Sequence, residues 1–259
     1  MNRIKTTFEN LKKNKKLALM PFLVAGFPNF GQSLKLLKTL ATEADLLEIG
    51  FPYSDPLADG PVIQRADQVA LRAGSTTSKV FKLIKELRRT TEIPITVLVY
   101  ANLVYQRGVE KFYHDAKVAG VDGILIPDVP FEEMNIFFQV AQKNDVANIC
   151  LIATTTNTTR LKQIFKFAQG YLYLTSVVGI TGARKDIPQK TLSYLKQLKK
   201  QTKLPIAVGF GIANKAQVKK LKVSGADGVI VGSSLIKLIN KSSKIDFRYL
   251  LKFLRRLNS

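Results

Sequence analysis

Three carboxylates stand close together in a short stretch of the chain. Glu48 lies inside the apolar run 46–49, and Asp55 and Asp59 follow in a loop rich in proline and glycine. A glutamate among apolar residues is rarely buried unless it is paired or used. The chemistry open to it is proton transfer, because burial raises the pKa of a carboxyl group toward neutral pH. The structural alternative is an ion pair between Glu48 and a neighbouring lysine or arginine.

The elements that must hold these carboxylates are indicated by short apolar runs that alternate with helical patterns. The apolar runs predict strands at 18–25, 45–50, 95–99, 122–126, 147–152, 171–176, 205–208 and 227–231. The periodic segments predict helices near 33–42, 62–73, 77–89, 104–119, 131–143, 157–168, 187–200 and 214–223. Continuous apolar strands joined by helices are typical of a parallel sheet that is covered on its outer face.

Eight such units predict an α/β fold, a TIM (β/α)8 barrel that forms a single domain over residues 1–259. An internal repeat supports this prediction, because Ala-Gly-Val-Asp-Gly-Ile-Leu-Ile at 119–126 recurs as Ser-Gly-Ala-Asp-Gly-Val-Ile-Val at 224–231. The alternative fold is a doubly wound open sheet, but no Gly-x-Gly-x-x-Gly motif follows the first strand.

Each end of the chain predicts one extra helix. Ile4, Phe8 and Leu11 have helical spacing ahead of the first strand. The segment 244–257 places five apolar side chains on one helical face, namely Phe247, Leu250, Leu251, Leu254 and Leu257. We expect this helix to pack on the barrel exterior; a membrane-surface helix is the alternative, because basic residues line its other side. No apolar run approaches the roughly 20 residues that span a membrane, so no membrane partner is expected.

The carboxyl ends of all strands in such a barrel meet at one mouth. The last three loops are rich in glycine, which lets backbone N–H groups approach a phosphate closely; the residues are Gly182, Gly209, Gly211, Gly232 and Ser233. Aromatic and aliphatic side chains would line the same mouth: Phe22, Leu98, Tyr100, Leu125, Tyr173 and Phe210. A flat hydrophobic ring with a phosphorylated tail would fit there. Tight turns and core packing are the structural alternatives.

Composition limits the possible functions. The net charge of +21 suggests a nucleic-acid partner, but the lysines are spread over every predicted helix, so we expect none. The single cysteine, Cys150, excludes a disulfide within the chain and indicates a reducing compartment, the cytoplasm. The single histidine, His114, argues against a histidine-based triad or a multi-histidine metal site, so no metal is predicted.

Residues 48–61, Glu-Ile-Gly-Phe-Pro-Tyr-Ser-Asp-Pro-Leu-Ala-Asp-Gly-Pro, resemble the signature of the tryptophan synthase alpha subunit family. The similarity runs from about Pro21 to about Lys237 and includes the motifs at 100–103, 128–130, 179–182, 209–212 and 232–233. The resemblance implies a lyase of tryptophan biosynthesis that cleaves indole-3-glycerol phosphate to indole and glyceraldehyde 3-phosphate. It also implies that this chain needs no cofactor, since pyridoxal phosphate belongs to a partner beta subunit.

The same resemblance assigns residues. Glu48 matches the acid–base residue and Asp59 its partner. The indole pocket matches Phe22, Tyr100, Leu125, Tyr173 and Phe210, and the phosphate site matches Gly182, Gly211, Gly232 and Ser233. Thr181 would reach Asp59 from a lid at 179–186. The interface with the beta subunit, in a complex of two alpha and two beta chains, would lie near Pro52, Asp55 and Asn102. Ala153, Val177 and Val178 depart from the family pattern and leave the shape of the pocket rim open.

Three other functions remain as alternatives. A different phosphosugar barrel, such as an isomerase or epimerase, would share the phosphate site, although a metal-dependent epimerase would need histidine ligands. A basic binding module would need clustered charges. A catalytically weak subunit that only regulates its partner would usually have lost Glu48 or Asp59, and both are present.

Overall fold

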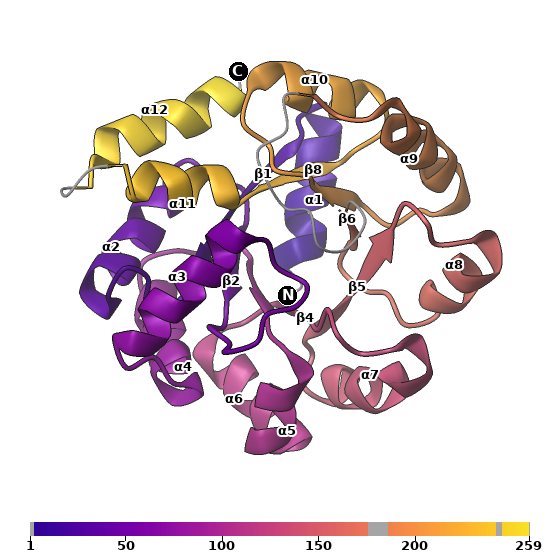
Figure 1. The fold of residues 1–259 in the computed structure, drawn as a ribbon. Helices are drawn as coiled ribbons and strands as arrows, with labels where there is room; N and C mark the ends of the chain where they lie inside the picture. Colours follow the sequence, from indigo (N-terminus) through magenta and orange to yellow (C-terminus); the bar gives the residue numbers. More distant parts are fainter. Residues whose placement is uncertain (1–2, 176–185, 242–244, 259) are drawn as a thin grey trace.

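The computed structural model describes residues 3–175, 186–241 and 245–258 of the chain. Eight parallel strands close into a barrel in chain order, with the eighth strand paired to the first (Figure 1). They are β1 (Ala18–Val24), β2 (Leu47–Gly50), β3 (Ile95–Leu98), β4 (Gly123–Leu125), β5 (Ala147–Ala153), β6 (Leu172–Thr175), β7 (Ile206–Gly209) and β8 (Gly228–Val231). The predicted TIM barrel is confirmed, and the strand bounds differ from the predicted ones by at most two residues.

Helices surround this barrel and follow most strands (Figure 1). They are α1 (Arg3–Lys13), α2 (Phe30–Ala41), α3 (Pro61–Arg72), α4 (Thr77–Arg88), α5 (Ala101–Arg107), α6 (Val109–Ala119), the 3-10 turn η1 (Phe131–Glu133), α7 (Met134–Lys143), α8 (Thr158–Ile164), α9 (Gln189–Gln201), α10 (Lys215–Val223), α11 (Ser233–Ile239) and α12 (Phe247–Asn258).

Two helix predictions need correction. The single helix predicted at 104–119 is two helices, α5 and α6, because Gly108 between them has a φ of 84°, which the helical ladder cannot accommodate. The short helix α11 was not predicted at all. It follows β8 after a single residue, Gly232, and its apolar sequence lacks the polar cap that marks other helix starts, such as Asn29 ahead of α2.

The two additional helices at the ends of the chain are both present. Ile4 and Phe8 of α1 are buried, and α1 lies across the end of the barrel where the strands begin (Figure 1). Leu250, Leu254 and Leu257 of α12 are buried, and α12 contacts α2, α10 and α11. The apolar face of α12 is therefore occupied by the barrel exterior, as predicted. Within the described ranges, no helix combines the length and apolar character needed to cross a membrane.

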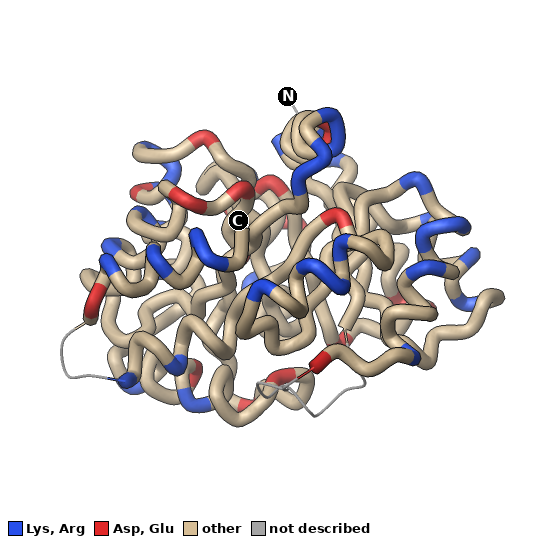
Figure 2. Tube along the Cα trace, turned by 90° about the horizontal axis from the view of Figure 1, so that it is seen from above, with Lys and Arg blue, Asp and Glu red and all other residues tan. Residues whose placement is uncertain are grey.

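Lysine and arginine are dispersed over the molecule. Figure 2 shows them on the N-terminal helix and on both sides of the barrel, with aspartate and glutamate between them. This dispersed arrangement agrees with the sequence-based expectation that the charge of +21 does not form one basic stripe.

A repeated clamp ties the starts of neighbouring strands together. An aspartate just before an even-numbered strand accepts the backbone N–H at the start of the preceding strand, and its own N–H donates back to that residue. Asp122 forms this pair of bonds with Ile95, at 2.8 Å each, and Asp227 forms it with Ile206, at 2.8 Å each. Asp45 does the same with Leu19, at 2.8 and 3.0 Å. The internal repeat at 119–126 and 224–231 thus encodes a structural device of the barrel.

Candidate active site

Glu48 lies in the middle of the barrel wall, in β2. It is paired in register with Phe22 of β1 and Thr96 of β3, and its side chain is 0% exposed. Neither carboxylate oxygen has a hydrogen-bond partner among the described residues, and no ion pair reaches it there. The Tyr171 hydroxyl lies nearby but outside hydrogen-bond geometry, and it is 3.2 Å from Thr96 Oγ1. Among the described residues, therefore, no ion pair explains why Glu48 is buried.

This environment alters the acidity of Glu48. Burial raises the pKa of its carboxyl group to about 8, and the carboxylate of Asp59 adds to the rise. Near neutral pH the group is therefore mostly protonated, and it can give up a proton and regain it at little cost.

Asp59 lies in the loop between β2 and α3. The Tyr100 hydroxyl donates a hydrogen bond to its Oδ2 at 2.8 Å and accepts the Ala58 N–H at 3.1 Å. From α3, the Gln64 amide donates to the Asp59 carbonyl oxygen at 2.8 Å. Burial raises the pKa of Asp59 to about 6, and the hydrogen bond from Tyr100 opposes the rise. Asp59 is consequently mostly ionised at neutral pH, in contrast to Glu48.

Phe22 connects the strand that carries Glu48 with the loop that follows β8. A Cβ atom on Gly50 would lie 2.7 Å from the Phe22 ring, and one on Gly232 would lie 3.0 Å from it. Only glycine therefore fits at these two positions beside the ring. Tyr173 in β6 stands in a similar relation to β7, because a Cβ atom on Gly209 would lie 2.6 Å from its hydroxyl oxygen. Burial, and after it the charge of Glu48, raises the pKa of the Tyr173 phenol well above its ordinary value.

The remaining candidates take up positions at the strand ends. Leu125 ends β4 and Phe210 follows β7, and both are buried. Gly211 has a φ of 63°, a backbone conformation that favours glycine. Gly232 precedes α11 and Ser233 is its first residue, while the Ser234 hydroxyl donates to the Ile212 carbonyl oxygen at 2.6 Å. The loops after β7 and β8 are therefore joined. Thr181 and Gly182, Val177 and Val178, and the predicted lid up to residue 185 lie outside the described residues.

The residues suggested for a partner interface differ in exposure. Asp55 and Asn102 are exposed, whereas Pro52 is buried within this chain. Leu57, in the same loop as Asp55, is 74% exposed, which is unusual for a large apolar side chain.

Sequence reasoning missed several residues of this site. Tyr53 stacks on Tyr100 with ring centroids 4.8 Å apart and planes at 19°. A third buried carboxylate, Asp67, lies on the inner face of α3. One signal could have revealed it: Ile63, Asp67 and Ala70 follow helical spacing, so the pattern assigns the carboxylate to the apolar face.

No group of three or more His, Cys, Asp or Glu side chains in the described ranges could hold a metal ion. A cavity of about 770 Å³ lies at the opposite end of the barrel, between α1 and the starts of several strands. Its four acidic side chains, Glu9, Asp122, Asp145 and Asp227, are each paired with a lysine or arginine. None of the candidate residues lines this cavity.

Comparisons with known proteins point in one direction. The family model described as tryptophan synthase alpha chain matches residues 8–255. The tryptophan synthase alpha chain of Methanothermobacter thermautotrophicus is 48% identical over 224 residues, which are 86% of this chain and 83% of that relative. The tryptophan synthase A-subunit structure from Pyrococcus furiosus is similar with a TM-score of 0.88 and 35% identity, covering 93% of this chain and 98% of that one. A chain from the Pyrococcus furiosus tryptophan synthase a2b2 complex gives a TM-score of 0.87 with the same identity and coverage.

Proposed function

The chain belongs to the tryptophan synthase alpha chain family, and from that premise we propose which of its residues carry the reaction. The reaction itself is the cleavage of indole-3-glycerol phosphate to indole and glyceraldehyde 3-phosphate in tryptophan biosynthesis. The enzyme is thus a lyase, which sets aside the isomerase and epimerase alternatives.

We assign the proton transfers to Glu48. Cleavage requires a proton on C3 of the indole ring, so that the ring can accept the electrons of the breaking carbon–carbon bond. It also requires removal of the proton from the glycerol hydroxyl beside that bond, which leaves an aldehyde. One carboxyl group with a pKa of about 8 can perform the two steps in turn, first as acid and then as base.

Asp59 is assigned to the ring nitrogen. As a carboxylate it would accept a hydrogen bond from the indole N–H and stabilise the positive charge that protonation of C3 creates. The observation that carries the proposal is the difference in surroundings: the buried Glu48 oxygens have no hydrogen-bond partner among the described residues, whereas Asp59 accepts a bond from the Tyr100 hydroxyl. The pKa accordingly rises to about 8 for Glu48 and to about 6 for Asp59. One acid and one anion therefore coexist at neutral pH, as the mechanism requires.

The substrate would lie across the mouth of the barrel. Phe22, Leu125, Tyr173 and Phe210 would hold the indole ring, and Tyr100 would hold Asp59. Gly182, Gly211, Gly232 and Ser233 would hold the phosphate through close backbone approach, and Thr181 would reach Asp59. The contact of the Phe22 ring with Gly232 supports this arrangement, since it brings the apolar slot up to a glycine loop.

The proposed partner is a tryptophan synthase beta subunit. The related Pyrococcus furiosus protein forms an a2b2 complex. In this family the alpha chain has no cofactor of its own, and pyridoxal phosphate resides on the beta subunit. The side chains that would face the partner are the exposed Asp55, Leu57 and Asn102. Pro52 is buried and would contribute by fixing the conformation of the loop. A cytoplasmic location is part of the same proposal, and the absence of a second cysteine supports it.

The purified chain with indole-3-glycerol phosphate tests the reaction. We expect indole and glyceraldehyde 3-phosphate in equal amounts, with a gain in rate when a beta subunit is added. Gly211→Val or Gly232→Val should raise KM by blocking backbone approach to the phosphate. Indolepropanol, which lacks the phosphate, should bind far more weakly than indolepropanol phosphate. Equal binding of the two ligands would contradict the proposed phosphate site. If neither indole nor glyceraldehyde 3-phosphate formed, the assignment of these residues to the reaction would be wrong.

A further inference from the structure

Tyr53 is an aromatic residue of the active-site loop to which the mechanism above gives no task. Its ring stacks on the ring of Tyr100, with centroids 4.8 Å apart and planes at 19°. Tyr100 is buried, whereas Tyr53 is half-buried. Among the described residues the Tyr53 hydroxyl forms no hydrogen bond, so the ring is the part of this side chain that contacts the site.

The start of the loop is fixed to the strand that leads to Tyr100. The backbone N–H of Phe51 donates to the carbonyl oxygen of Leu98, the last residue of β3, at 2.8 Å. The Phe51 ring packs against one buried ring of α4 and one of α6, with centroids 5.3 and 5.5 Å away. Tyr53 and Tyr100 each follow two residues after this bond, so the two stacked rings stand on backbones that are tied together.

The other end of the same loop contacts the Tyr100 hydroxyl. This hydroxyl donates to Asp59 Oδ2 at 2.8 Å and accepts the Ala58 N–H at 3.1 Å. Gln64 of α3 donates to the Asp59 carbonyl oxygen at 2.8 Å and so fixes the loop there. The hydroxyl is the outermost atom of its side chain, and a hydrogen bond weakens steeply when donor and acceptor lose alignment. The direction of the Tyr100 ring therefore decides whether Asp59 keeps its donor.

We propose that Tyr53 is a positioning residue for Asp59, whose ring stacks on Tyr100 and holds the Tyr100 hydroxyl in hydrogen-bond geometry with the Asp59 carboxylate. This proposal rests on the role of Asp59 in the proposed function. Tyr53 itself does not touch the reacting atoms. Its contribution is geometric, and displacement of a reacting group by about 1 Å can reduce a rate about 100-fold.

Two substitutions of Tyr53 separate this role from plain stability. Tyr53→Leu removes the ring face but stays apolar, whereas Tyr53→Phe keeps the ring and removes only the hydroxyl. We expect Tyr53→Leu to lower kcat about tenfold, with KM for indole-3-glycerol phosphate within about twofold, and Tyr53→Phe to keep kcat within about twofold of wild type. If Tyr53→Leu does not fold, Tyr53→Met also removes the ring and replaces it in the experiment.

The route through the Tyr100 hydroxyl is tested by repeating the substitution in a Tyr100→Phe background. Tyr100→Phe keeps a ring for the stack and removes the hydroxyl that Tyr53 would position. Residues that act through one another are not additive, so Tyr53→Leu should cause little further loss of kcat there. Equal loss in both backgrounds, an unchanged kcat in Tyr53→Leu, or a Tyr53→Phe variant as slow as Tyr53→Leu would each overturn the proposal.

The pKa of Asp59 gives a readout without catalysis. The hydrogen bond from Tyr100 opposes the rise of this pKa, which is about 6. The pKa should therefore lie above the wild-type value in Tyr53→Leu and in Tyr100→Phe, and it should be unchanged in Tyr53→Phe. Three other ionisable groups whose pKa values respond to the charge of Asp59 are retained in all these variants: Glu48 of β2, Asp67 of α3 and Tyr173 of β6.

NMR titration of the chain with carbon-labelled aspartate measures this pKa, and the signal that is lost in Asp59→Asn identifies the group. The titration also keeps the two proposals distinct. If the wild-type chain released no indole, the proposed function would fail while the titration still decided the role of Tyr53. An Asp59 pKa that is the same in Tyr53→Leu as in the wild-type chain would contradict that role.

Discussion

At the end of the barrel where the strands begin, Asp122 and Asp227 accept backbone N–H groups and pair with basic side chains. Arg88 and Arg3 lie 2.7 and 3.1 Å from Asp122, and Lys199 lies 2.5 Å from Asp227. At the other end, Glu48 and Asp67 each have buried oxygen atoms without a partner among the described residues. The same chemical group is thus satisfied at one end and left bare at the other.

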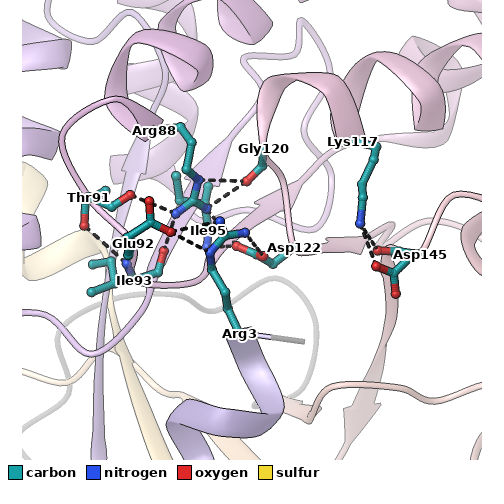
Figure 3. A network of polar contacts seen from close by, with 10 residues as sticks. All are labelled: Arg3, Arg88, Thr91, Glu92, Ile93, Ile95, Lys117, Gly120, Asp122 and Asp145. Carbon is teal, nitrogen blue, oxygen red and sulfur yellow. Dashed lines mark hydrogen bonds and ion pairs between the residues drawn. The ribbon is translucent and has the colours of Figure 1, made fainter. Parts of the chain in front are cut away.

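Figure 3 shows how complete the first arrangement is. Arg88 donates to the carbonyl oxygens of Gly120 and Ile93 as well as to Asp122, and Arg3 joins Asp122 to Glu92. With both oxygens hydrogen-bonded and two arginines beside it, the Asp122 carboxylate contributes to the stability of the barrel and stays ionically paired. A bare carboxyl group lowers stability, but it keeps its proton available. The comparison shows that hydrogen-bond and ion-pair partners, rather than residue type, distinguish structural from reactive carboxyl groups in this barrel.

The largest expected effect comes from Glu48→Gln. The substitution keeps size but removes proton transfer, so kcat should fall about 1,000-fold or more, within the range for loss of general acid–base catalysis. The melting temperature near neutral pH should rise, because the wild-type carboxyl group must stay protonated in the folded chain at a pH where it ionises in the unfolded chain. Steady-state kinetics and thermal unfolding measure the two quantities. A variant that loses stability and keeps its rate would place Glu48 with the structural carboxylates.

Asp122→Ala should produce the opposite result. It leaves the Ile95 N–H and the Arg88 guanidinium without their acceptor, so the free energy of unfolding should fall by about 3 kcal/mol. The kcat of the folded fraction should stay within about twofold of wild type, since Asp122 lies at the far end of the barrel. Urea unfolding gives the stability. Arg255→Ala, which removes an exposed pair with Glu43, is the matched control and should cause no measurable loss. A large fall in kcat for Asp122→Ala would show that the two ends are coupled.

Asp59→Asn should lower kcat about 100-fold, because a neutral amide stabilises the protonated indole ring poorly. The Tyr100 hydroxyl can still donate to the side-chain oxygen, so the loop should keep its place. Steady-state measurement of kcat and of KM for indole-3-glycerol phosphate tests both expectations. Unchanged kinetics would return Asp59 to the role of a loop residue.

The smallest expected effects concern pH. The ratio kcat/KM should rise as Asp59 ionises through about pH 6 and fall as Glu48 ionises through about pH 8. Both folded-state pKa values lie above the ordinary values of 3.8 and 4.5. The stability linked to these groups is therefore complete below about pH 4 and is lost as the pH rises through about 6 and 8.

Glu48→Gln should accordingly remove part of the fall in stability between about pH 5 and pH 8, while Arg255→Ala should leave the pH profile over this range unchanged. Thermal melts of the wild-type chain and of both variants across this pH range test these expectations. A melting temperature that rises with pH up to 9 in the wild-type chain would contradict the bare state of these carboxyl groups.

Much of this contrast could be predicted from the sequence. The apolar runs predicted all eight strands, because a strand buried on both faces has little choice of residue type, and Glu48 stood out as the exception inside one of them. The helix break at Gly108 was missed because helical periodicity continues across it. Tyr53 was missed as a site residue because its place depends on a ring stack with Tyr100, which no local pattern records. Asp67 was missed although its helical spacing with Ile63 and Ala70 assigns it to the buried face of α3.

The closure of the barrel has a consequence for biosynthesis. β1 pairs with β2 on one side and with β8 on the other, where Ala18 is in register with Gly228. A growing chain therefore exposes one edge of β1 until β8 has left the ribosome, and an open strand edge readily pairs with another chain. Ile4 of α1 likewise packs against Gly123 and Gly170, which are made long after it. The nascent polypeptide therefore cannot complete its barrel one unit at a time, and the β1 edge stays open to other chains until synthesis of β8 is finished.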